Sequence, residues 1–210
     1  MGKRSYLCGY ISGIFFGGDA ISGEFQNKTG YFSVPNPIRR SSIYIGKWLA
    51  AFIASAVILG IFTVVTVGNG LYYFSGVPYQ FGESLLFTVF YLAAVLGFTF
   101  FFSSLFKSSS MSILVTAIVF LFVFTLVQEL VAGLVQIEPW FILTYGAQII
   151  GNVLTTTYPP HITTSNFGPE GGVSLTTYNA TIPEGLAIIA IYFAITAIVG
   201  LILFERKEFN

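Results

Sequence analysis

The side chains best suited to nucleophilic, acid–base or metal chemistry are scarce in this chain. Its 210 residues include one histidine, His161, and one cysteine, Cys8. Apolar runs long enough to cross a bilayer separate the two, which argues against a Cys–His nucleophile pair. A zinc site with three His or Cys ligands is not credible with one of each. A lone loop histidine is most often solvated, so we predict no catalytic residue and no metal site.

Two polar residues interrupt an otherwise apolar run at 111–135, namely Gln128 and Glu129. In a helix, Glu129 would lie roughly 28 Å from the start of the run, near the far membrane boundary. An ionisable residue within a membrane span is a functional candidate by default. The alternative is a carboxylate that reaches water beyond the bilayer. Both residues are therefore intramembrane polar candidates.

The most distinctive polar segment is 19–47, which carries acidic and basic residues between two apolar runs. Pro35 and Pro37 prevent a continuous helix across its middle, because proline lacks an N–H and restricts the preceding residue. The part before the prolines could form a short amphipathic helix at the membrane interface. Arg39 and Arg40 follow the prolines, close to the start of the next apolar run.

The composition of the chain indicates which class of protein these residues belong to. The chain is 55% hydrophobic and 9% charged, whereas about 25% of residues are charged in soluble domains. Its mean hydropathy is +0.81. A soluble domain of this size cannot bury so much apolar surface, but a bilayer can. A net charge of zero offers no global attraction to nucleic acid.

The hydrophobic pattern predicts an all-α polytopic membrane bundle that forms a single transmembrane domain over residues 1–210. Four strong transmembrane helices are expected at 44–68, 84–106, 111–135 and 185–204. Residues 5–18 are apolar but would rise only roughly 21 Å, so we expect a shortened transmembrane helix there. A signal-like anchor and a re-entrant segment are the alternatives.

The long polar stretch 136–184 is expected to be a loop on one side of the membrane. Its part 139–154 is amphipathic but broken, and we predict a helix that lies on the membrane surface. A re-entrant or fifth spanning segment is the alternative. The remainder, from Thr155 to Pro183, is rich in Thr, Gly, Pro and Tyr and is expected to be loop.

The charge distribution predicts the orientation. Loops 19–43 and 107–110 and the C-terminus share one side, which carries Lys and Arg, whereas 69–83 and 136–184 carry none. The positive-inside rule therefore predicts that 19–43 and the C-terminus are cytoplasmic in a multi-pass cell-membrane protein.

Segment 19–47 resembles the signature of ABC exporter permeases of the type-2 class. In that family an acidic residue opens a short cytoplasmic segment, and a Gly–Thr pair, a Pro-x-x-Arg element and a Gly-Lys pair follow. The matching positions are Glu24, Thr29 with Gly30, Pro37 with Arg39 and Arg40, and Gly46 with Lys47. The C-terminal helix that closes on Glu205 and Arg206 is also similar.

The resemblance implies a permease subunit of an ATP-driven transporter, an exporter, that pairs with a second permease subunit and with a separate ABC ATPase. ATP and Mg²⁺ would bind the ATPase, and this chain would need no cofactor. Family permeases usually have six spans, so the chain looks N-terminally short. The resemblance implies that segment 19–43 and Lys47 contact the ATPase or lipid phosphates, through Asp19, Glu24, Lys28, Thr29, Gly30, Pro37, Arg39, Arg40 and Lys47.

Three alternatives remain open from the sequence. Arg39 and Arg40 could serve only to fix the topology. The chain could be a membrane scaffold or assembly factor without transport, which a neighbouring gene for a Walker-A ATPase would argue against. An intramembrane enzyme is disfavoured, because the spans contain no His and no mid-membrane acid. The sequence does not identify a substrate.

Overall fold

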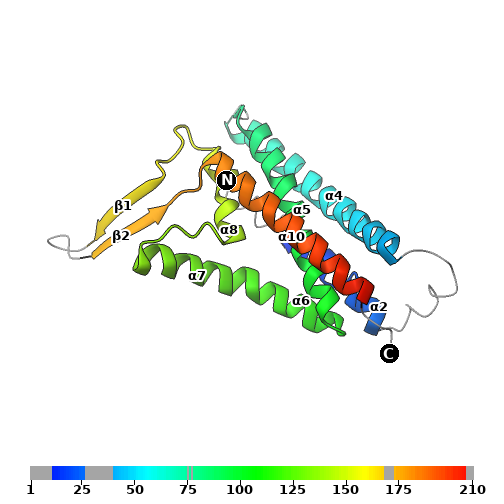
Figure 1. Ribbon diagram of the computed structural model, residues 1–210. Helices are drawn as coiled ribbons and strands as arrows, with labels where there is room; N and C mark the ends of the chain where they lie inside the picture. Colours follow the sequence, from blue (N-terminus) through cyan, green and yellow to red (C-terminus); the bar gives the residue numbers. More distant parts are fainter. Residues whose placement is uncertain (1–10, 27–39, 75, 77, 168–172, 207–210) are drawn as a thin grey trace.

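The computed structural model describes residues 11–26, 40–74, 76, 78–167 and 173–206. Long helices form a bundle, and a β-hairpin projects from one end of it (Figure 1). Four helices are long and apolar enough to cross a membrane, at Arg40–Tyr73, Phe81–Leu105, Ser109–Gly133 and Ile182–Arg206. The predicted all-α polytopic bundle with four strong transmembrane helices is confirmed.

The elements within the described residues follow the chain in a simple order. The helices are α2 (Ser22–Gln26), α4 (Arg40–Phe74), α5 (Phe81–Leu105), α6 (Ser109–Ile118), η1 (Val119–Val123), α7 (Phe124–Leu130), η2 (Val131–Val135), α8 (Leu143–Gly146), α9 (Gln148–Asn152) and α10 (Ile182–Arg206). The strands β1 (Ile162–Phe167) and β2 (Val173–Tyr178) pair antiparallel, with Ile162 opposite Tyr178.

Helix α5 is the centre of the bundle. Of its most apolar stretch, 61% is buried within the chain, against 17–22% for the other three spans. Its most buried large side chains include Tyr91 and Phe100, which belong to two separate core clusters. Because the other spans keep most of their apolar surface exposed, they are the ones that face lipid or other subunits.

Helix α4 is longer than the predicted span 44–68. It begins at Arg40 and ends at Phe74, a rise of roughly 52 Å against about 30 Å of hydrocarbon. The predicted loop 69–83 is therefore helical up to Phe74. Its aromatic residues Tyr72 and Tyr73 are exposed on the helix rather than in a loop. The backbone hydrogen bonding within α4 continues past Gly68 and Gly70, because glycine weakens a helix without blocking it.

The third span is one continuous rod from α6 to η2, with two π-helical turns, η1 and η2. It ends at Gln136, whose φ of 54° places a non-glycine residue in the left-handed region. The N–H of Ile137 then donates to the carbonyl of Val131 at 3.3 Å. A left-handed residue just past the last turn is a common way for a helix to end.

Residues 11–18 are helical and pack against α5. A Cβ at Gly13 would lie 2.9 Å from Val95 Cγ1, and one at Gly17 would lie 2.9 Å from Thr99 Cβ. The two glycines are four residues apart and form one small face, which allows the helix backbones to approach closely. The predicted helix at 5–18 is thus described over 11–18, and its first residues lie outside the described ranges.

The loop 136–184 differs from its prediction. In place of one surface helix over 139–154, two short helices, α8 and α9, are buried between the spans. Leu143, Tyr145, Ile149 and Ile150 have no exposed surface. The predicted loop from Thr155 to Pro183 contains the β1–β2 hairpin. The apolar residues that suggested a membrane-surface helix instead fill the space between α5, α7 and α10.

Candidate functional site

One end of the bundle gathers the described residues of segment 19–47. Asp19 lies in the turn after helix 11–18, Glu24 lies in α2, and Arg40 and Lys47 lie in the first turns of α4. Lys28, Thr29, Gly30, Pro37 and Arg39 lie outside the described residues. The start of α2, the α5–α6 turn, the start of α4 and the end of α10 meet here (Figure 1).

The side chain of Ser103, near the end of α5, holds the backbone at the start of α2. Its Oγ accepts the N–H of Ile21 at 3.1 Å and the N–H of Ser22 at 2.9 Å. It lies 3.0 Å from the carbonyl of Gly18, to which it donates. Ser103 and Ser22 are fully buried. One hydroxyl of the central helix therefore satisfies the otherwise orphaned N–H groups at this helix start.

A second set of hydrogen bonds joins the segment to α6. The Ser109 hydroxyl donates to the Asp19 carboxylate. The Ser109 N–H donates to Oε1 of Gln26 at 2.8 Å. Both ends of the short segment Asp19–Gln26 are therefore bonded to the first residue of α6. Hydrogen bonds therefore attach α2 and the turn before it to both α5 and α6.

The basic residues of α4 bond to neighbouring backbone. Nζ of Lys47 donates to the carbonyl of Ala20 at 2.6 Å. Nη1 of Arg40 donates to the carbonyl of Glu205, at the end of α10, at 3.1 Å. Lysine and arginine stabilise such carbonyl-rich ends of helices and turns. Within the described ranges, every Lys and Arg, namely Arg40, Lys47, Lys107 and Arg206, lies at this end of the bundle, hereafter the basic end.

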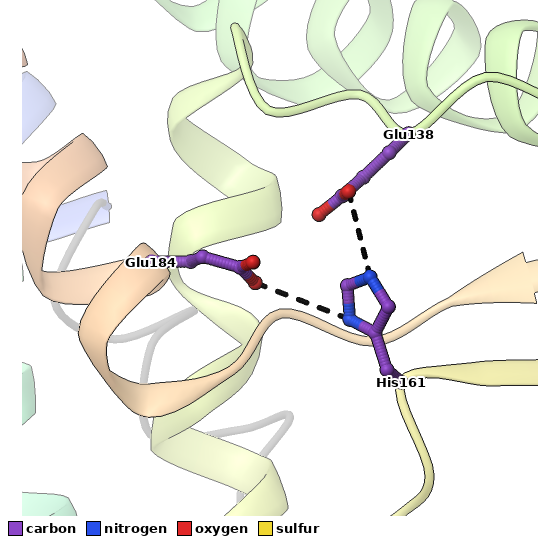
Figure 2. Close-up of side chains that lie close together, drawn as sticks. All are labelled: Glu138, His161 and Glu184. Carbon is purple, nitrogen blue, oxygen red and sulfur yellow. Dashed lines mark ion pairs between the residues drawn. The ribbon is translucent and has the colours of Figure 1, made fainter.

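The opposite end, hereafter the hairpin end, consists of η2, α8, α9, the β1–β2 hairpin and the start of α10. It brings His161 between two carboxylates (Figure 2). Nε2 of His161 lies 3.5 Å from Oε2 of Glu138, and Nδ1 lies 4.0 Å from Oε2 of Glu184. One ligand atom from each residue lies within 4.8 Å of the others.

Hydrogen bonds hold these three side chains in place. Tyr145 donates its hydroxyl to Oε1 of Glu138 at 2.7 Å, and the N–H of Thr181 donates to Oε2 of Glu184 at 3.0 Å. Nδ1 of His161 lies 3.0 Å from the carbonyl of Asn179. Burial, with the hydrogen bond to Glu138 next, raises the pKa of Tyr145 far above its usual range, so its hydroxyl stays a donor.

The intramembrane candidates Gln128 and Glu129 lie in α7 near the hairpin end and differ in environment. Oε1 of Gln128 accepts the Thr144 hydroxyl at 2.9 Å, which joins α7 to α8. Glu129 is exposed on the outer surface of α7, beside Leu126 and Leu130. Gln128 thus joins two helices, whereas Glu129 is exposed, and its role as an intramembrane polar candidate stays a prediction.

Sequence reasoning missed Ser103 and Ser109, because single serines near a turn carry no signal of their own. It also missed the grouping of His161 with Glu138 and Glu184, because it considered only His and Cys as ligands. One signal in the sequence could have suggested this grouping. All three residues belong to the polar stretch 136–184, and this stretch holds the only histidine of the sequence.

The fold defines a multi-pass integral membrane protein whose long helices surround α5 and whose described Lys and Arg residues lie at one end. The family model described as ABC-2 family transporter protein matches residues 6–209. The chain belongs to this family and is therefore a membrane permease component of an ABC transporter. A comparison with curated proteins gave no match.

Proposed function

We propose that the chain is one of two permease subunits of an ATP-driven exporter, and that residues 19–43 couple it to a separate ATPase subunit. The observation that supports this proposal is the attachment of α2 to α5 and α6 through Ser103 and Ser109. A segment that is pushed by a partner needs a stiff connection to the helices that must move. These hydrogen bonds supply that connection at the helix that lies at the centre of the bundle.

ATP can favour one arrangement of the pathway only if the ATPase contacts the permease differently in its two states. Asp19, Glu24, Lys28, Arg39 and Arg40 are the charged residues of the segment that supply such contacts. Thr29, Gly30 and Pro37 belong to the same segment, and Lys47 donates to the carbonyl of Ala20 in its first turn. ATP and Mg²⁺ bind the ATPase, and the permease contributes no catalytic residue.

The orientation in the membrane follows from the same segment. The basic end carries Arg40, Lys47, Lys107 and Arg206, the Lys and Arg residues that the structure describes, and the positive-inside rule therefore favours a cytoplasmic position for residues 19–43 and the C-terminus in a cell membrane. The ATPase subunits then meet the basic end. The hairpin end faces the opposite compartment. The exposed apolar faces of α4, α7 and α10 remain for lipid and for the second permease subunit.

The test is charge reversal of Arg39 and Arg40 together to Glu, in the permease reconstituted in vesicles with its ABC ATPase subunit. We expect the permease-dependent change in the rate of ATP hydrolysis to fall at least about five-fold, the lower end of typical coupling effects. Arg206→Glu is the matched control, since it reverses an exposed charge at the same end outside the segment. Equal hydrolysis in both variants would refute the coupling role.

A further inference from the structure

The three residues at the hairpin end come from three separate elements. Glu138 follows η2, His161 precedes β1, and Glu184 lies in the first turn of α10 (Figure 2). Their side chains are partly buried, with exposed fractions of 28% for Glu138, 37% for His161 and 43% for Glu184. Two carboxylates around one imidazole form a site with excess negative charge, which a bound cation would offset.

The distance between His161 and Glu138 is informative about which cation fits. At 3.5 Å, Nε2 and Oε2 are too far apart for a strong charge-assisted hydrogen bond, which spans about 2.7–2.9 Å. Two ligand atoms of a tetrahedral zinc ion, each about 2.0–2.1 Å from the metal, are about 3.4 Å apart. The observed separation therefore suits two ligands of one metal ion better than a direct hydrogen bond.

The surrounding hydrogen bonds are those of a supported metal site. A carbonyl oxygen only accepts, so in the neutral imidazole the contact with Asn179 favours the tautomer with its proton on Nδ1, and the lone pair of Nε2 then faces Glu138. Tyr145 occupies Oε1 of Glu138 and leaves Oε2 facing His161. Ligating histidines and carboxylates in metalloproteins are oriented by such bonds, which fix the histidine tautomer and the carboxylate position.

We propose that Glu138, His161 and Glu184 bind one divalent first-row transition-metal ion of the zinc class. The imidazole disfavours Ca²⁺ and Mg²⁺, which prefer oxygen ligands alone. Oε2 of Glu184 now lies 4.0 Å from Nδ1 of His161 and accepts the Thr181 N–H, so Glu184 must turn toward the Nε2 side to become the third ligand. The three residues are close enough for this, since one ligand atom of each lies within 4.8 Å of the others. The ion ties the start of α10 to β1 and to the segment after η2, and so holds the hairpin end together.

The experiment uses the full chain, purified in detergent without a histidine tag and stripped with a chelator. Zn²⁺ is added, and binding is measured by isothermal titration and by the metal content after dialysis. We expect one ion per chain, a rise in the thermal unfolding midpoint, and no displacement by millimolar Mg²⁺ or Ca²⁺. Absence of retained zinc, or displacement by Mg²⁺, would overturn the proposal.

Variants assign the binding to these residues. We expect Glu138→Gln, His161→Gln and Glu184→Gln each to weaken zinc binding at least about 100-fold. Tyr145→Phe removes only a supporting hydrogen bond and should weaken it about 10-fold. Glu83→Gln, an exposed acid in the first turn of α5, is the matched control and should bind as the unmodified chain does. Circular dichroism and gel filtration verify folding. Unchanged affinity in the folded ligand variants would refute the site.

Discussion

The two ends of the bundle differ in how their connecting segments are attached to the spans. At the basic end, small hydroxyl groups of Ser103 and Ser109 bond to the backbone and side chains of the segment Asp19–Gln26. At the hairpin end, large apolar side chains such as Leu143 and Ile149 are fully buried between the spans. Hydrogen bonds contribute about 1 kcal/mol each and can be exchanged for others, whereas a packed core resists rearrangement.

This difference suggests where motion enters the molecule. We expect motion to enter at the basic end, because hydrogen bonds from Ser103 and Ser109 tie α2, on which a partner would act, to α5 and α6. The hairpin end should keep its packing, because its close contacts are between backbone and large side chains. Substitutions at the two ends should therefore differ in whether they change stability alone or also change coupling to the ATPase.

The largest effect on stability is expected at the hairpin end, from Gly185→Ala. A Cβ at Gly185 would lie 2.4 Å from Ile149 Cγ2 and 2.9 Å from the carbonyl oxygen of Gly146, which is backbone and cannot rotate away. Overpacking of this kind destabilises by about 2–3 kcal/mol. The measurement is the thermal unfolding midpoint in detergent. Gly60→Ala is the control, with nothing within 4 Å, and a loss equal to that control would contradict the close packing.

An intermediate effect is expected at the basic end, from Ser103→Ala. The substitution leaves the buried N–H groups of Ile21 and Ser22 without their acceptor, at a cost of about 2 kcal/mol. It should also reduce the permease-dependent change in ATP hydrolysis, since α2 loses its attachment to α5. Ser112→Ala is the matched control, because that serine is also buried and its hydroxyl has no hydrogen-bond partner. Identical behaviour of the two variants would contradict a special role for Ser103.

The smallest effect is expected from Tyr178→Phe on β2. The Tyr178 hydroxyl donates to the carbonyl of Gln136, the left-handed residue that ends the third span. Its loss should cost about 1 kcal/mol and loosen the hairpin without changing coupling. Hydrogen exchange of the hairpin amides measures this loosening. Tyr72→Phe, which changes an exposed ring near the end of α4, is the control and should show no change. A defect of Tyr178→Phe in coupling to the ATPase would contradict the proposed difference between the two ends.

The spans could be predicted from sequence because a bilayer imposes a simple rule on length and polarity. The predicted spans 44–68, 111–135 and 185–204 lie within helical segments of the structure, and 84–106 passes the end of α5 at Leu105 by one residue. Helix α4 starts earlier and ends later than expected. The stretch 139–154 could not be predicted in this way. Its apolar residues are compatible with a membrane surface or with a protein core, and local pattern does not distinguish the two.

The candidate sites also divide into residues that the sequence indicated and residues that it did not. The sequence pointed to Asp19, Arg40 and Lys47 as part of a functional segment, because charged residues are rare in so apolar a chain. It gave no sign that Ser103 would hold α2, since the two are more than eighty residues apart in the chain. It treated His161 as a solvated side chain, since nothing local indicated that Glu138 and Glu184 would lie beside it.

The sequence by itself determined that the chain is a multi-pass membrane protein and which four segments form its long apolar helices. Hydrophobic length and charge decide these properties residue by residue, because the bilayer acts as a solvent on each segment separately. Only the tertiary structure decided that α5 is the central helix and that Ser103 and Ser109 hold the segment Asp19–Gln26. It also decided that His161 lies between two carboxylates, since such contacts depend on how distant segments pack.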